Sequence, residues 1–161
     1  MRRQEAEGYL ETKRLADQLR RSYDGEAWHG PAVRELLDGV TADRAAAKPI
    51  AGAHSIWELV LHVEAWERES LLVVGGKTFE ILAGESDWPP VRETSAEEWR
   101  ATLERLESTT RNLVAAIRAM DDAKLNESAG GREFNFHFLL HGVVQHNLYH
   151  AGQIALLKKM A

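Results

Sequence analysis

Seven histidines are the residues of this 161-residue chain with the clearest chemical potential, and four of them lie between positions 137 and 150. Two of these, His146 and His150, are one helical turn apart, and a third candidate, His62, lies far upstream. Two imidazoles four residues apart on a helix are a common unit for binding a divalent metal ion, and a third imidazole completes the ligand set. Three neutral ligands leave the ion an open position, as in a catalytic site.

The helical periodicity places these three histidines on faces that must be buried. At about 100° per residue, His146 and His150 fall in the middle of an apolar stripe, and His62 falls at the edge of another. An imidazole buried without a partner is costly, and a shared cation would remove that cost, although satisfied core histidines are the alternative. The stripes are Leu139, Val143, Ile154 and Leu157 in one segment and Leu59, Val63, Trp66 and Val73 in the other.

The remaining histidines are weaker candidates. His137 and His141 are also four residues apart, but they lie opposite His146 on the helical wheel, on a second apolar stripe. We interpret that stripe as a contact with another subunit or with loop segments. His29 and His54 fall in a predicted connection, where a solvated or capping role is expected, although His54 is placed to reach the mouth of the site.

Three polar residues lie near the predicted ligands along the chain. Glu69 follows His62 by seven residues and Gln153 follows His150 by three, so both are candidates for hydrogen-bond acceptors behind the ligands. Glu69 is also a candidate for proton transfer. The position of Glu58, three residues after Ser55, is explained by a role in a helix cap. The solvated flank of an amphipathic helix is the simpler interpretation of all three, so the catalytic residues stay unassigned.

Four long segments with helical periodicity must position these side chains. Two of them open with serine-led capping patterns, at Ser55 and Ser95. A short helix is expected near 31–38, and strand signals are nearly absent apart from an extended piece near 77–81. We therefore predict an all-α fold, a four-helix bundle with long crossing connections, as a single domain over residues 1–161. The four segments are residues 9–23, 55–74, 95–120 and 135–160.

Composition excludes several classes of protein. The formal net charge of -5 argues against a binder of nucleic-acid phosphates, which needs a basic face. Cysteine is absent, which excludes disulfides, thiolate metal ligands and a cysteine nucleophile. No apolar run approaches the length of a membrane span, and the N-terminal residues MRRQEAEGYL lack the apolar core of a signal peptide. We expect a cytoplasmic protein without membrane or nucleic-acid partners.

Three stretches carry a resemblance to a known family. These are HSIWELVLHVEAWE (54–67), HNLYHAGQIALLKK (146–159) and the leading segment YDGEAWHGPAVRELLDGVTADRA (23–45). With them the chain resembles the DinB/YfiT-like family of metal-dependent hydrolases and transferases, from about residue 10 onward. The resemblance implies a four-helix bundle, often a homodimer, that holds zinc, nickel or a similar divalent ion. By position, the implied ligands are His62, His146 and His150.

The resemblance also implies a type of chemistry. Some relatives use low-molecular-weight thiols such as bacillithiol, mycothiol or glutathione. The expected function is a metal-dependent hydrolase or a thiol-dependent S-transferase, in which a metal-bound water or thiolate attacks a small electrophilic substrate. No domain specific to mycothiol or maleylpyruvate chemistry is present, and the substrate is not indicated. The alternatives are a non-enzymatic metal- or ligand-binding bundle of a stress response, and a purely structural helical dimer.

Overall fold

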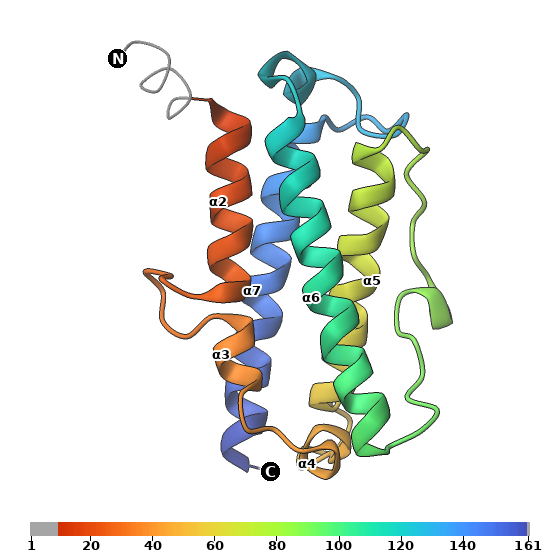
Figure 1. Ribbon diagram of the computed structural model, residues 1–161. Helices are drawn as coiled ribbons and strands as arrows, with labels where there is room; N and C mark the ends of the chain where they lie inside the picture. Colours follow the sequence, from red (N-terminus) through yellow and green to blue (C-terminus); the bar gives the residue numbers. More distant parts are fainter. Residues whose placement is uncertain (1–9, 161) are drawn as a thin grey trace.

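The computed structural model describes residues 10–160, and its four long helices lie side by side as a bundle (Figure 1). Helices α2 and α7 run in one direction and α5 and α6 in the other. Both α2 and α5 contact α6 and α7, so α7 has one face toward α2 and another toward α5. The predicted all-α fold is confirmed. The long helices are α2 (Glu11–Asp24), α5 (Ile56–Val74), α6 (Ala96–Ala119) and α7 (Phe136–Met160).

The connection between α5 and α6, residues 75–95, is the long crossing that positions the site. Because α5 and α6 run in the same direction, this connection returns along the outside of the bundle next to α5 (Figure 1). It contains the single turn η1 (Gly84–Ser86) and is otherwise irregular. The extended piece expected near 77–81 is irregular chain without a strand. The one bridge among the described residues pairs Ser128 with Asn135.

Short helices complete the other connections. The helix expected near 31–38 is present as α3 (Val33–Leu37), whereas α4 (Ala42–Ala46) was not predicted. The turn η2 (Asp122–Asn126) lies between α6 and α7. The start predicted for the first helix, Tyr9, lies outside the described residues. Among those described, no helix combines the length and the apolar character that crossing a membrane requires.

The serine caps differ between the two helices that carry them. Ser55 Oγ accepts a hydrogen bond from Glu58 N at 3.2 Å, and Ser55 N donates to Glu58 Oε2 at 2.7 Å, so the predicted capping box is confirmed. Ser95 Oγ also accepts from the backbone, but the Glu98 carboxylate accepts from Arg105 instead of closing the box. A cap of this kind contributes about 1 kcal/mol to stability.

The core consists of two apolar clusters stacked along the bundle. One contains Trp57, Leu59 and Ile154, and the other contains Leu113 and Leu140. On each long helix, a buried polar residue lies between the residues that belong to one apolar cluster and those that belong to the other. The buried residues of the predicted stripes belong to these clusters, which confirms the helical periodicity. The four polar residues are Ser22 on α2, Glu67 on α5, Thr110 on α6 and Asn147 on α7.

Candidate metal centre

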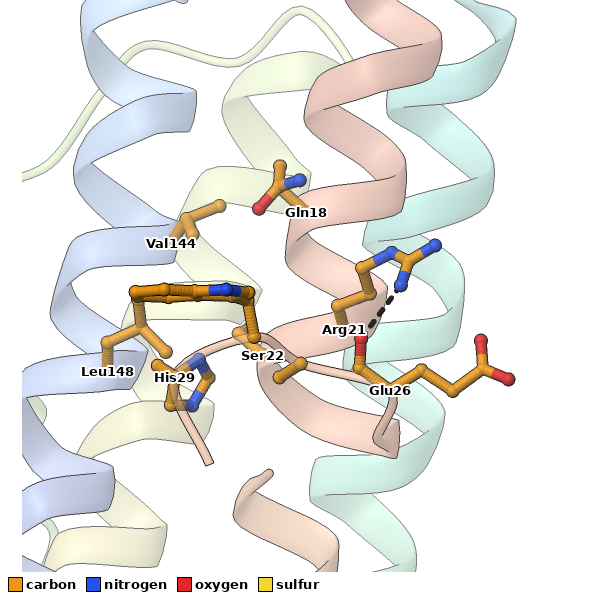
Figure 2. Close-up of a pocket in the computed structure, with 9 residues that line it drawn as sticks. Gln18, Arg21, Ser22, Glu26, His29, Val144 and Leu148 are labelled. Carbon is orange, nitrogen blue, oxygen red and sulfur yellow. Dashed lines mark hydrogen bonds between the residues drawn. The ribbon is translucent and has the colours of Figure 1, made fainter. Parts of the chain in front are cut away.

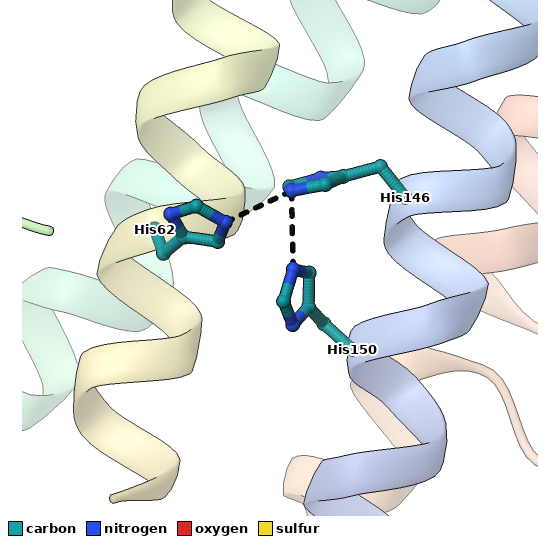
Figure 3. A group of neighbouring side chains, drawn as sticks. All are labelled: His62, His146 and His150. Atoms are coloured by element: carbon teal, nitrogen blue, oxygen red, sulfur yellow. Dashed lines mark hydrogen bonds between the residues drawn. The ribbon is translucent and has the colours of Figure 1, made fainter. Parts of the chain in front are cut away.

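The three histidines singled out by the helical wheel meet between α5 and α7. Figure 3 shows His62 reaching from α5 toward His146 and His150 of α7. His146 Nε2 lies 3.0 Å from His62 Nε2 and 3.1 Å from His150 Nε2. One ring nitrogen of each residue lies within 4.8 Å of the others, so the group is able to hold a metal ion. His62 and His150 are buried, and His146 is partly buried.

Oxygen acceptors hold two of the three rings from behind. His62 Nδ1 lies 2.7 Å from the backbone oxygen of Asp87, and His150 Nδ1 lies 2.7 Å from Gln153 Oε1. A ring nitrogen that faces such an acceptor carries the proton of the neutral imidazole, which leaves its Nε2 as a lone pair. The Nδ1 of His146 is buried and has no hydrogen-bond partner within residues 10–160.

The facing Nε2 atoms cannot satisfy one another by hydrogen bonding. His146 Nε2 has at most one proton to donate, and two lone pairs approach it, so at least one lone pair remains unmatched. A divalent cation accepts all three lone pairs at once while the outer nitrogens keep their protons. The donor set therefore fits a divalent ion, and three imidazoles suit zinc, nickel, copper or iron.

Burial keeps two of the imidazoles neutral. Burial, together with the neighbouring rings of His150 and His62, lowers the pKa of His146 to about 3. Burial also lowers the pKa of His150, against the opposing effect of its hydrogen bond to Gln153. Near pH 7 both rings are uncharged, which is the state in which a histidine binds metal.

The 75–95 connection supplies the parts of this site that the sequence did not reveal. Trp88 stacks on His62, with ring centroids 3.8 Å apart, and also on His54, with centroids 3.5 Å apart. Asp87 Oδ1 lies 3.1 Å from His62 Nδ1 and accepts a hydrogen bond from Trp66 Nε1 at 2.7 Å. No periodicity or motif marks residues in an irregular connection, so only its return along α5 brings these groups to the histidines.

The polar residues considered near the ligands have separate roles. Among the described residues only Gln153, of the three, hydrogen-bonds to one of the clustered histidines. Glu69 Oε1 accepts from Glu80 N at 2.6 Å and so anchors the start of the 75–95 connection to α5. Glu58 serves the cap described above and accepts a hydrogen bond from Lys48 Nζ at 2.8 Å.

His137 and His141 form a second cluster with a residue of α2. Their Nε2 atoms lie 3.8 and 3.9 Å from Glu11 Oε1, and their ring centroids are 4.4 Å apart. These three residues also form a group that is able to hold a metal ion, but their side chains are between 36% and 48% exposed. This second cluster lies on the face of α7 that turns toward α2.

The second apolar stripe of α7 lines a pocket together with a loop of the same chain. Figure 2 shows Val144 and Leu148 beside a pocket of about 330 Å³ that residues at the end of α2 and His29 also line. Arg21 Nη1 donates to the backbone oxygen of Glu26 at 2.7 Å and shapes this loop. The contact of this stripe with another subunit or with loop segments stays a prediction, and His29 lines this separate pocket.

Glu67 is a buried carboxylate that the sequence interpretation missed. Asn147 Nδ2 donates to its Oε1 at 2.6 Å, and the Thr110 hydroxyl contacts its Oε2. That hydroxyl also lies 2.9 Å from the backbone oxygen of Leu106 and has a single proton to give. Burial raises the pKa of Glu67 to about 7. Its position one helical turn after Val63, on the apolar stripe of α5, is the signal that would have identified it.

Fold and site together define a class, the helical bundles that place three imidazoles between two neighbouring helices. The family model of the DinB superfamily matches residues 26–154, and the chain belongs to this superfamily. No curated protein and no solved structure is significantly similar to the chain. The matched segment contains His62, His146 and His150, whereas Glu11 of the second cluster lies outside it.

Proposed function

We propose that His62, His146 and His150 bind one divalent metal ion, zinc or nickel, through their Nε2 atoms. We also propose that the chain forms a single domain around this site. The observation that carries this proposal is the convergence of three Nε2 atoms while the opposite nitrogens of His62 and His150 face oxygen acceptors. Gln153 and Asp87 then act as positioning residues, because they fix the orientation and tautomer of the rings they contact.

Membership of the DinB superfamily and the three-histidine cluster support an enzymatic role. We infer a metal-dependent hydrolase or a thiol-dependent S-transferase acting on a small electrophile. When bound, the ion would act as a Lewis acid that lowers the pKa of a coordinated water or thiol. In hydrolysis the oxygen of water bonds to the electrophilic atom, and the leaving group departs with the electron pair of the broken bond. In transfer, the sulfur of a low-molecular-weight thiol takes the place of that oxygen; in both cases a proton is released.

We also propose that the chain works as a homodimer. Three large apolar side chains along one side of α7 support this proposal: Tyr149, Leu156 and Met160 are 68%, 61% and 56% exposed. Exposed apolar side chains gathered on one helix are typical of a contact surface. The measurement is the molar mass of the purified protein in solution, with Leu156→Lys expected to shift it toward the monomer.

The test of the metal site is elemental analysis of the full-length protein, followed by activity screens with and without a thiol. We expect about one divalent ion per chain, turnover of aryl esters or of thiol-reactive electrophiles, and loss of both ion and turnover in His146→Ala. The matched control is His137→Ala, which removes a histidine from the same helix outside the cluster. Full metal content in His146→Ala would overturn the site, and a bound ion without any turnover would favour the non-enzymatic binding bundle.

A further inference from the structure

A pocket of about 280 Å³ opens beside the three-histidine cluster, between α5 and α7. Its lining is almost entirely apolar and includes one side of His146. The pocket therefore adjoins the proposed metal site, since His146 belongs to both. The other side chains that matter most are four aromatic rings: Trp66 on α5, Phe79 and Phe134 in the connections, and Phe138 at the first turn of α7.

The aromatic wall of this pocket is built where two connections meet. Phe79 and Phe134 pack edge to face with centroids 5.3 Å apart, and Phe79 lies 6.3 Å from Trp66. Phe79 N donates to the backbone oxygen of Gly130 at 3.0 Å. A Cβ atom at Gly130 would lie 2.4 Å from Phe79 N, and the φ of Gly130 is +59°, so glycine is what permits this approach. The position of Phe79 is thus a fixed feature of the fold.

The polar groups of the pocket are already engaged, apart from those of His146. Ser70 Oγ donates to the backbone oxygen of Trp66 at 2.8 Å, and the Trp66 indole donates to Asp87 Oδ1 at 2.7 Å. A polar group placed among these rings would lose its hydrogen bonds to water and find no replacement, so the pocket favours an apolar occupant. The centroid of the His146 ring lies 6.2 Å from that of Trp66, so an imidazole forms part of the wall of an otherwise apolar space.

We propose that this pocket binds the apolar part of the substrate, an aryl ring or a similarly compact hydrocarbon group, while the reacting atom lies beside the three Nε2 atoms. The proposal rests on the proposed function, because it takes the histidine cluster as the place of reaction. An engineered apolar cavity of about 150 Å³ is enough to bind benzene. A pocket of about 280 Å³ therefore accommodates one substituted ring or two fused rings.

Two helical glycines of α7 provide a matched pair of variants. Gly142 lines the pocket, and nothing lies within 4 Å of a Cβ atom added there, so the Cβ of Gly142→Leu has room and we expect the rest of its side chain to occupy part of the pocket. Gly152 has the same open surroundings ten residues further along the helix and does not line the pocket. Both changes replace a helical glycine by a good helix former, so neither is expected to impair folding.

The probes are acetohydroxamate and benzohydroxamate, which share a metal-binding group and differ by the ring. Their dissociation constants are measured by calorimetry on the metal-loaded, full-length protein. In the wild type and in Gly152→Leu, benzohydroxamate is expected to bind at least about tenfold more tightly than acetohydroxamate, because the ring is buried. In Gly142→Leu the two constants become equal, and the one for acetohydroxamate is unchanged. Equal constants in the wild type, or a preserved difference in Gly142→Leu, would overturn the pocket proposal.

A third probe separates this proposal from the proposed function. Indole carries no metal-binding group, and its binding to chelator-treated protein is followed by saturation-transfer NMR. If the binding of neither hydroxamate depends on the ion, the metal-site proposal is wrong. Indole binding that is lost in Gly142→Leu and kept in Gly152→Leu would still support the pocket proposal in that case. Indole binding that is absent, or the same in both variants, overturns the pocket whatever the state of the metal site.

Discussion

Two histidine pairs with identical spacing lie on α7 and have different surroundings. His146 and His150 turn toward α5 and meet His62, whereas His137 and His141 turn toward α2 and meet Glu11. Nine residues separate the corresponding members of the two pairs, which is about half a turn of rotation around the helix. The same local pattern therefore faces two different neighbours.

The two clusters differ in what fixes their rings. In the first, ring nitrogens lie 3.0 and 3.1 Å apart, and Asp87 and Gln153 hold the outer nitrogens of two rings. In the second, the ring nitrogens lie 3.8 and 3.9 Å from one carboxylate oxygen, and solvent reaches all three side chains. Exposed groups must give up conformational freedom to hold a geometry, and they gain little from it. Spacing alone therefore does not distinguish the two clusters, whereas burial and the acceptors behind the rings do.

The largest expected effect comes from removing a ligand of the first cluster. His150→Ala should weaken zinc binding by more than about a hundredfold. Removing even the hydrogen-bond partner behind a ligand lowers metal affinity by about 10- to 100-fold, and removing the ligand itself costs more. The matched change in the second cluster, His141→Ala, should leave the affinity within about threefold. Competition with a chromophoric chelator measures both. Equal losses in the two variants would show that the clusters do not differ in the way their surroundings indicate.

The next effect concerns the buried carboxylate of Glu67, on the same helix as His62. Burial raises the pKa of Glu67 from 4.5 to about 7, so the folded chain retains a proton that the unfolded chain has released between those values. The contribution of Glu67 to stability is therefore expected to fall by about 3 kcal/mol as the pH rises from about 4.5 to about 7, while the buried histidines, whose pKa values are lowered, contribute in the opposite direction. The difference in the free energy of unfolding between the wild type and Glu67→Gln should therefore change by this amount across the pH range and then level off.

Denaturant unfolding of chelator-treated protein across this pH range tests the expectation for Glu67. The control is Glu104→Gln, an exposed carboxylate of α6 whose ion pair with Arg100 is 3.7 Å long. That change is expected to alter the free energy of unfolding by less than about 1 kcal/mol. A difference between the wild type and Glu67→Gln that stays constant across the pH range would contradict the assignment to this residue.

A smaller effect is expected from the support behind a ligand. Gln153→Ala removes the oxygen that faces His150 Nδ1 and should weaken zinc binding by about 10- to 100-fold without changing the number of ions per chain. Gln153→Glu should restore tight binding, since a carboxylate also accepts the hydrogen bond. Gln145→Ala, on an exposed position of the same helix, is the control. An unchanged zinc affinity in Gln153→Ala would mean that the ring is held in place by packing alone.

The smallest effect is expected at the second cluster. Glu11→Gln removes the charge shared by His137 and His141 and should change the free energy of unfolding by less than about 1 kcal/mol, as is usual for exposed ion pairs. The metal content of the purified protein should also stay the same. Loss of a bound ion in this variant would show that the exposed cluster is a site after all, and the contrast between the two faces of α7 would have to be abandoned.

Much of the fold could be predicted because its determinants are local. The apolar stripes of α5, α6 and α7, the cap at Ser55 and the helix after Pro31 follow from periodicity and backbone hydrogen bonding within a few residues. Helix α4 is only five residues long and is too short to show a periodic pattern. The irregular 77–81 segment is positioned by contacts such as Phe79 with Gly130, which join residues about fifty positions apart.

The residues of the candidate site also fall into those that could be predicted from local patterns and those that could not. The inward orientation of His62, His146 and His150 could be predicted because an apolar stripe shows which side of a helix is buried. Asp87 and Trp88 could not, since an irregular connection has no period from which a direction can be calculated. Glu67 lies between these cases, because its place on the α5 stripe was visible while its partners on α6 and α7 were not.

By itself the sequence determined the four long helices, the buried side of each and the three histidines that share those sides, because these follow from the order of apolar residues along the chain. Only the tertiary structure decided that His62 meets His146 and His150 while His137 and His141 meet Glu11. The physical reason is that each helix has several possible neighbours. Which one it faces depends on how all the buried faces pack together, including the return of the 75–95 connection along α5.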